Sequence, residues 1–519
     1  MRAGTSRLGF VVAGLLLGIL MAAMDNTIVS TAMATIVSEL GGLDKYVWVT
    51  SAYMVAEMAA MPIFGKLSDM YGRKRFFVFG IAVFLLGSVL CGTADTIVEL
   101  SVYRAIQGIG GGALMPIAFA IVFDVFPVEK RGAMGGLFGA VFGISSLAGP
   151  LLGAFITDHL DWRWNFYINL PLGVIALFFI VAFYRESAVH AKQKIDWWGA
   201  ITLISAIVAL MFALELGGQL YAWDSAVILG LFAAFAVLFA AFLLAERRAE
   251  EPIISFGMFR KRLFASSNAA GLFYGAAFIA ASVYIPLFVQ GVTGGTATNS
   301  GLILLPMTLS SVVAAQVGGF LVQRTSFRNV MILSAVIFIA GIALLATITP
   351  DTTKTVLSIY MAIAGFGVGF SFSVLGMSAI QDFGPEQRGA ASATMSFIRS
   401  LGMTVGITVF GIIQRNIFAN RLTESLAGMD GGAEGLPSLD DPRTLLASEA
   451  RKAIPAPVLE RIVSDLSKSI TGMFWWTVVP AVLALITVFF MGSAKMLGHG
   501  PGAAAARDRQ EPGPAASPK

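Results

Sequence analysis

Fourteen apolar stretches, each about 20 residues long, follow one another along this chain and limit what it can fold into. Of its 519 residues, 57% are hydrophobic and only 13% are charged. A water-soluble surface needs roughly twice that charged fraction. We therefore predict an all-α integral membrane protein. Its helices are expected at 8–32, 47–65, 76–94, 97–124, 133–157, 165–184, 197–217, 225–245, 264–289, 302–322, 330–349, 356–379, 391–413 and 470–494.

The distribution of Lys and Arg predicts how the chain is oriented. With the N-terminus inside, the cytoplasmic segments hold 23 Lys and Arg, whereas the short outer loops hold three. This asymmetry predicts a multi-pass protein of the cell membrane with both termini in the cytoplasm. The outer segment 414–469 holds seven more, but loops near that length are translocated regardless of charge.

Composition also argues against several classes of function. The single Cys91 allows no intrachain disulfide, and the histidines, His159, His190 and His499, are far apart, so we expect no metal site and no cofactor. HExxH, GxSxG and phosphate-binding loop motifs are absent from the sequence, which argues against an enzyme. The net charge of +4 forms no basic stripe, so no nucleic-acid partner is expected.

One cytoplasmic loop has a specific pattern. Residues 65–75 read GKLSDMYGRKR and fit G-x-L-x-D-x-x-G-R-[RK], the loop between helices 2 and 3 that marks the major facilitator superfamily. Partial counterparts occur at 127–132 and 382–389, as two repeated halves would produce. The chain therefore resembles a membrane transporter of the major facilitator fold. That resemblance implies two six-helix bundles, with two extra helices between them.

Four shorter motifs narrow the resemblance. Residues 24–29 look like the LDxTIV motif of helix 1 in the fourteen-helix drug:proton antiporter family, which includes QacA-like and EmrB-like multidrug exporters. Residues 162–171 match its WRWxFxINxP motif, 104–112 its helix 4 motif, and 149–153 the helix 5 motif associated with exporters. The resemblance covers residues 8–494. It implies a proton-coupled antiporter that exports amphipathic, often cationic, drugs or toxic compounds by alternating access. An exporter of lipids or of a specific metabolite is the alternative, and a nutrient importer is less favoured.

The motifs and composition predict four regions. Residues 1–184 form an N-terminal six-helix bundle, and 185–262 hold two additional transmembrane helices with cytoplasmic connectors. Residues 263–494 form the C-terminal bundle with a long extracellular loop, 414–469, in which 455–467 is a candidate amphipathic helix. The tail 495–519 is rich in Ala, Gly and Pro and is expected to be disordered.

Charges inside the predicted helices are the candidate proton-coupling residues. Because a charge at the bilayer centre costs roughly 2.5–3.5 kcal/mol or more, such residues are usually kept for function. We expect Asp25 and Glu57 to bind protons, with a structural ion pair as the alternative for both. The resemblance implies that Arg104 is the cation of the proton pathway, with a helix-packing ion pair as the alternative. Glu215 is a further candidate near the outer boundary, where a solvated glutamate is equally consistent with the pattern, and Arg399 is expected to be structural.

The predicted substrate site combines acidic, aromatic and thioether side chains. Such groups bind amphipathic cations by contact area and by cation–π interaction. The predicted binding residues are Asp25, Tyr53, Met54, Glu57, Met61, Met115 and Glu215. The expected partners are small amphipathic molecules, protons and the lipid bilayer, and the protein is expected to be a monomer.

Charged residues at the cytoplasmic helix ends are predicted to act as a conformational latch. The resemblance implies a charge relay that closes the inner side in one state and breaks in the other. Its members would be Asp69, Arg73, Asp124 and Arg131. The simpler interpretation is that the basic residues only anchor the topology, and both can hold.

Helix 5 contains a predicted hinge at Gly149, Pro150 and Gly153. The glycines leave a smooth face that a neighbouring helix can approach. Pro150 has no N–H and therefore releases the carbonyl of Ser146 from the helical hydrogen-bond pattern. Ordinary transmembrane packing is the alternative role of the glycines.

Overall fold

The computed structural model describes residues 2–41, 47–186, 196–218, 220–295, 297–426 and 456–495. The regular secondary structure in these ranges is helical, with two isolated β-bridges and no strand among them. By length and composition, thirteen helical spans of the described chain could cross a membrane. A further helix, α2 (Val47–Tyr71), carries Glu57, Lys66 and Asp69, packs on the span Ile97–Val125, and is a fourteenth candidate by its length. The predicted all-α membrane fold is confirmed.

The remaining helices keep the predicted order, mostly with longer bounds. The first half continues with α1 (Arg2–Leu40), α3 (Arg73–Gly92), α4 (Ile97–Val125), α5 (Val128–His159), α6 (Trp164–Tyr167) and α7 (Asn169–Phe183). The middle of the chain holds α8 (Trp197–Leu216), α9 (Ala226–Arg248) and the short α10 (Phe256–Phe259). The second half holds α11 (Arg262–Gly291), α12 (Ala297–Arg324), α13 (Phe327–Leu345), α14 (Lys354–Gln381), the 3-10 turn Pro385–Gln387, α15 (Arg388–Leu426) and α17 (Ala456–Phe489).

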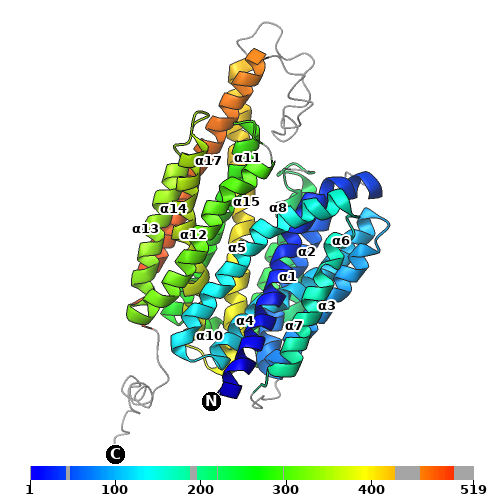
Figure 1. Cartoon of the computed structure of the whole chain (residues 1–519), viewed down its shortest axis with the longest axis vertical. Coiled ribbons are helices and arrows are strands. Elements are labelled where there is room, and N and C mark those ends of the chain that lie inside the picture. The colour runs from blue at the N-terminus through cyan, green and yellow to red at the C-terminus, as the bar shows by residue number, and fades with distance from the viewer. Residues whose placement is uncertain are drawn as a thin grey trace, which may run out of the picture.

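Two groups of helices lie side by side, α1 to α7 in one and α11 to α17 in the other (Figure 1). The groups meet where α15 packs on α2 and where α12 packs on α5. The pair α8 and α9 pack on each other, and α8 also contacts α2. We call the end of the molecule that holds residues 65–75 the inner side, because the basic residues predict that it faces the cytoplasm.

At the outer side, α15 and α17 project together beyond the other helices (Figure 1). The segment 414–469, predicted to be a long outer loop, is helical at both ends, since α15 runs to Leu426 and α17 starts at Ala456. The candidate amphipathic helix at 455–467 is the first part of α17. Buried apolar side chains at helical spacing hold the projecting pair together: Phe418, Leu422, Val458, Ile462 and Leu466. Residues 427–455, 187–195 of the connectors and 496–519 of the tail lie outside the described residues.

Glycines allow the closest helix contacts. A β-carbon on Gly365 of α14 would lie 2.6 Å from the Cα of Met307 in α12, and one on Gly369 would lie 2.6 Å from the Cα of Ser311. In hydrocarbon, where lipid tails are as apolar as the side chains, such backbone contact is a main source of helix association. These two glycines therefore set the α12–α14 distance.

The first prediction tests this packing. Gly365→Val should lower the melting temperature of the purified protein, because overpacking a tight contact costs about 1–3 kcal/mol. Gly230→Val in α9 is the matched control, since a β-carbon there would meet nothing within 4 Å. Equal melting temperatures for the two variants would contradict the assignment.

Candidate functional site

A buried ion pair lies among the helices of the first half. Asp25 of α1 and Arg104 of α4 are both fully buried, and Arg104 Nη1 contacts Asp25 Oδ2. The guanidinium lies over the ring of Tyr53, with its Cζ 4.2 Å from the ring centroid. Its Nη2 donates to Asn26 Oδ1 at 2.9 Å. Asp25 and Arg104 are therefore brought together as one unit, in which both charges have partners.

Two side-chain amides complete the surroundings of Asp25. Gln107 Nε2 and Asn169 Nδ2 each donate to Asp25 Oδ1 at 2.8 Å. Both amides also donate to Ser88 Oγ of α3, at 2.7 and 3.2 Å. Four helices thus contribute to one polar cluster, which we call the Asp25 cluster: Asp25, Ser88, Arg104, Gln107 and Asn169.

Three members of the Asp25 cluster were not predicted as site residues. Asn169 begins α7 after a one-residue interruption of the helix at Ile168, and its side chain is fully buried. Asn169 and Gln107 both belong to the quoted motifs 162–171 and 104–112, so a polar residue inside a motif was the available signal. Ser88 lies in α3 with no such signal.

Glu57 is placed differently from Asp25. It is half-buried in α2, and no described residue forms a hydrogen bond or ion pair with it. Met54, one turn away, is 39% exposed, whereas Met61 is buried. Met115 of α4 is half-buried. Of the predicted substrate residues, Asp25, Tyr53 and Met61 are covered in this conformation, and Met54 is the most open.

Glu215 lies at the outer end of α8 and points toward α2. Its carboxyl group forms a hydrogen bond with the Ser51 side chain, and it is half-buried. The extra helix pair is therefore linked to α2 at the level of the predicted substrate residues.

An apolar groove of about 450 Å³ separates α8 from α2 and α4. Every lining residue is apolar: Ala52, Val55, Ala56, Ala59, Ala60, Ile63, Phe64, Ala105, Ile109, Ile204, Val208 and Phe212. None of these residues was predicted to bind substrate. A ligand in this groove would make apolar contacts and would meet no polar side chain that could orient it.

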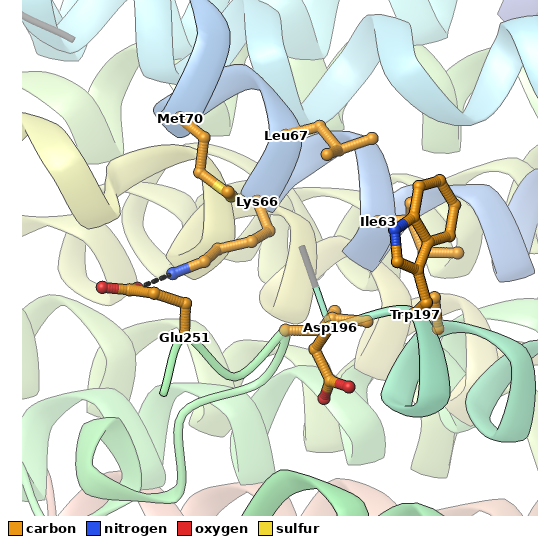
Figure 2. A pocket seen from close by; sticks show the side chains of 9 residues that line it. Ile63, Lys66, Leu67, Met70, Asp196, Trp197 and Glu251 are labelled. Carbon is orange, nitrogen blue, oxygen red and sulfur yellow. Dashed lines mark hydrogen bonds and ion pairs between the residues drawn. The ribbon is translucent and has the colours of Figure 1, made fainter. Parts of the chain in front are cut away.

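At the inner end of this groove, α2 is tied to the connectors of the extra helices. Lys66 Nζ and Glu251 Oε2 lie 2.8 Å apart, and Figure 2 shows this pair beside Asp196 and Trp197. The pair borders a small pocket that shares Ile63 with the groove. Lys66 belongs to the loop motif, so the extra pair contacts the same segment as the predicted latch.

The predicted latch joins the two halves at the inner side. Asp69 accepts hydrogen bonds from the backbone N–H groups of Gly389 and Ala390, both at 2.8 Å, and so binds the N-terminus of α15. Arg73 pairs with Asp69 at 3.2 Å and with Asp124. It also donates to the carbonyl of Pro385 at 2.5 Å.

Arg388 contacts the residues of the predicted latch, and sequence reasoning did not include it. Its Nη1 donates to Asp124 Oδ1 at 2.8 Å across the two halves. The signal was available, because 382–389 had been identified as a counterpart of the loop motif. Arg131 donates to the carbonyls of Phe123 and Phe126, at 2.7 and 3.1 Å, at the end of α4.

A close backbone contact accompanies the latch. A β-carbon on Gly389 would lie 2.5 Å from the Gly65 carbonyl oxygen and 2.6 Å from Ser68 Oγ. Ser68 and Ala393 next to this contact are fully buried. The inner side is therefore closed between α2 and α15 in this conformation.

The glycines of the predicted hinge pack against α1. A β-carbon on Gly149 would meet Thr27 Oγ1, and one on Gly153 would lie 2.8 Å from the Ile28 carbonyl oxygen. The packing role is therefore observed. α5 continues as one helix through Pro150, and its bending stays a prediction.

A family model described as Major Facilitator Superfamily matches residues 15–197 and again residues 194–407. The chain belongs to the major facilitator superfamily. Multidrug resistance protein 3 of Bacillus subtilis (strain 168) is 55% identical over 489 residues, covering 94% of this chain and 96% of that protein. Multidrug transporter protein MdtP of the same organism is 35% identical over 509 residues, covering 95% and 94%.

Solved structures show the same superfamily fold. The proton:xylose symporter XylE aligns with a TM-score of 0.63 at 14% identity, covering 95% of this chain and 98% of that one. The human organic anion transporter MFSD10 aligns with a TM-score of 0.58 at 16% identity, covering 92% and 99%. At these identities the likeness concerns the fold.

The second prediction separates the two roles open to the Asp25–Arg104 pair. Asp25→Asn leaves Arg104 buried without a counter-ion, which should cost about 3–5 kcal/mol of stability. The double variant Asp25→Asn with Arg104→Gln should recover most of that stability. If Asp25 carries protons, the double variant still lacks proton-driven transport in vesicles. Recovery of both stability and transport would make the pair structural only.

The third prediction concerns the latch. Asp69→Asn should lower turnover and leave equilibrium drug binding nearly unchanged, because it weakens the contact of α2 with the α15 N-terminus. Ser68→Cys, in a Cys91→Ala background, reports opening, since Ser68 is fully buried under Gly389. The thiol should react faster with an impermeant maleimide from the inner side in the Asp69→Asn variant. Unchanged labelling with lost drug binding would place Asp69 in folding or in the binding site.

Proposed function

We propose that this protein exports amphipathic, often cationic, drugs or toxic compounds across the cell membrane in exchange for protons. One observation carries the proposal. Glu57 is a half-buried acid inside a membrane helix with no hydrogen-bond or ion-pair partner in the described part of the chain, near Asp25 and Arg104, which are paired with each other. An ionisable residue placed in this way is by default a candidate for proton or substrate binding.

The comparisons support the direction of transport and the substrate class. Both Bacillus relatives are named as multidrug proteins, and one of them shares more than half of its residues with this chain. The helix 1, helix 5 and helix 6 motifs support the fourteen-helix drug:proton antiporter family. We propose bundles at 1–184 and 263–494, with the extra pair within 185–262; the two successive family matches, 15–197 and 194–407, support a division into two related halves. We further propose a monomer with both termini in the cytoplasm.

The conformation supports alternating access. The Gly65–Gly389 contact and the latch close the inner side, while Met54 remains 39% exposed beside Glu57. This arrangement fits a state open to the outside. The opposite state requires Asp69 to leave the α15 N-terminus and Arg388 to leave Asp124.

The free energy released by proton entry favours a transporter with more than one proton-binding acid. A proton moving down 100 mV and one pH unit releases about 3.7 kcal/mol. Expelling a monovalent cation against the same potential takes back about 2.3 kcal/mol, which leaves enough for a gradient of about tenfold. A dication needs at least two protons. Asp25, Glu57 and Glu215 are the proposed sites, and Met54, Met61, Met115 and Tyr53 supply contact area.

Export of lipids or of a specific apolar metabolite is the second candidate. The apolar groove between α2, α4 and α8 favours it, because its lining has no polar group to orient a cation. The two candidates differ in their dependence on membrane potential, since only a charged substrate moves charge outward.

The fourth prediction tests the proposal. In proteoliposomes with pH gradient and membrane potential clamped separately, the wild type should expel ethidium when protons flow inward. Glu57→Gln should abolish this efflux, because the amide cannot cycle a proton. Glu215→Gln should lower the efflux of divalent substrates more than the efflux of monovalent ones. Glu460→Gln, an exposed acid on the α17 projection, is the matched control. Wild-type rates in Glu57→Gln would refute the proton site.

A further inference from the structure

Arg399 of α15 is a cation without a counter-ion. Its Nη1 is buried and has no hydrogen-bond partner, and no described acid forms an ion pair with it. The other buried arginines differ, since Arg73, Arg104 and Arg388 are each paired with an aspartate. A charged side chain deep in a membrane helix normally finds such a partner. The structural role that the sequence suggested for Arg399 does not explain why this arginine has no acidic partner.

The Arg399 head group lies over an aromatic ring. Its Cζ lies 5.7 Å from the ring centroid of Phe372 in α14. Phe372 in turn makes an edge-on contact with Phe278 of α11, with centroids 5.6 Å apart. Arg399 and both rings are half-buried, so none of these side chains is completely covered by the rest of the protein.

The contact with Phe372 does not balance the cost of the charge. At 5.7 Å the guanidinium is close to the roughly 6 Å limit of cation–π attraction, so this contact is weak. A charged side chain within a membrane helix is costly unless it has a partner of opposite charge. The site therefore has a place for an anionic partner.

The depth of Arg399 fits the proposed substrate site. Phe397 and Leu401 of α15 pack in the same apolar cluster as Val55 and Met58 of α2. Thr404 Oγ1 lies 3.8 Å from Met58 Sδ. Arg399 is therefore close to the depth of Glu57, in the other half of the molecule.

We infer that Arg399 binds the carboxylate of an aromatic, amphipathic substrate. The inference rests on the proposed function and adds zwitterionic compounds to the cationic ones. A guanidinium presents paired N–H donors that match a carboxylate, and Phe278 and Phe372 offer flat surfaces for the attached ring. A zwitterion would place its carboxylate in the second half of the molecule and its cationic end toward the acids of the first.

Rhodamine B and its ethyl ester provide the test, because they differ only in whether the carboxyl group is free. Binding to purified protein is measured by fluorescence polarisation without any gradient. Arg399→Gln should raise the Kd of rhodamine B at least tenfold, as expected for losing a charge-assisted hydrogen bond, and change the Kd of the ester less than twofold. Arg421→Gln, an exposed arginine on the same helix, is the matched control and should change neither.

The wild type supplies a second measurement that does not depend on how a variant folds. Benzoate in excess should displace rhodamine B and leave the ester bound. Equal losses for both dyes in Arg399→Gln, no loss for either, or benzoate acting alike on both dyes would overturn the inference. Failure of the proposed function has a different signature, namely no proton-driven efflux of either dye from proteoliposomes, with the binding difference intact.

Discussion

The hydrocarbon core offers no water to hydrogen-bond, so each polar group placed there depends on a partner within the protein. The Asp25 cluster meets this demand with side chains from α1, α3, α4 and α7. Both oxygens of the carboxylate and three nitrogens of the guanidinium have partners. The cluster therefore fixes the relative positions of four helices, because moving any one of them would leave a buried polar group unsatisfied.

Glycine packing allows the polar contacts to form. Gly365 and Gly369 bring α14 onto α12, and Gly149 and Gly153 bring α5 onto α1. At the inner side, Gly65 and Gly389 let α2 and α15 touch at the backbone, and this proximity brings the Asp69 carboxylate to the N–H groups that begin α15. A carboxylate at a helix N-terminus contributes about 0.3–2 kcal/mol, which is weak enough to break during a transport cycle.

The extra helices are connected to α2, which carries part of the predicted latch. Lys66 pairs with Glu251, and Glu215 bonds to Ser51, so α8 and the connector after α9 contact α2 at both of its ends. A movement of α2 would therefore change both of these contacts. The apolar groove lies between these two contacts, so the same movement would change its width.

The sequence by itself determined the spans, the superfamily and the loop motif, and it predicted the orientation, because apolar length, Lys and Arg counts and short motifs are local properties. It also identified Asp25, Arg104, Asp69, Arg73 and Asp124 as charges of interest. Only the tertiary structure decided their partners, since Asp69 and Gly389 are 320 residues apart. The tertiary structure also identified Ser88, Asn169 and Arg388 as site residues, through their contacts with other helices. The α15–α17 projection and the unpaired Arg399 could not be read from the chain either, because burial and pairing depend on which distant helix lies alongside.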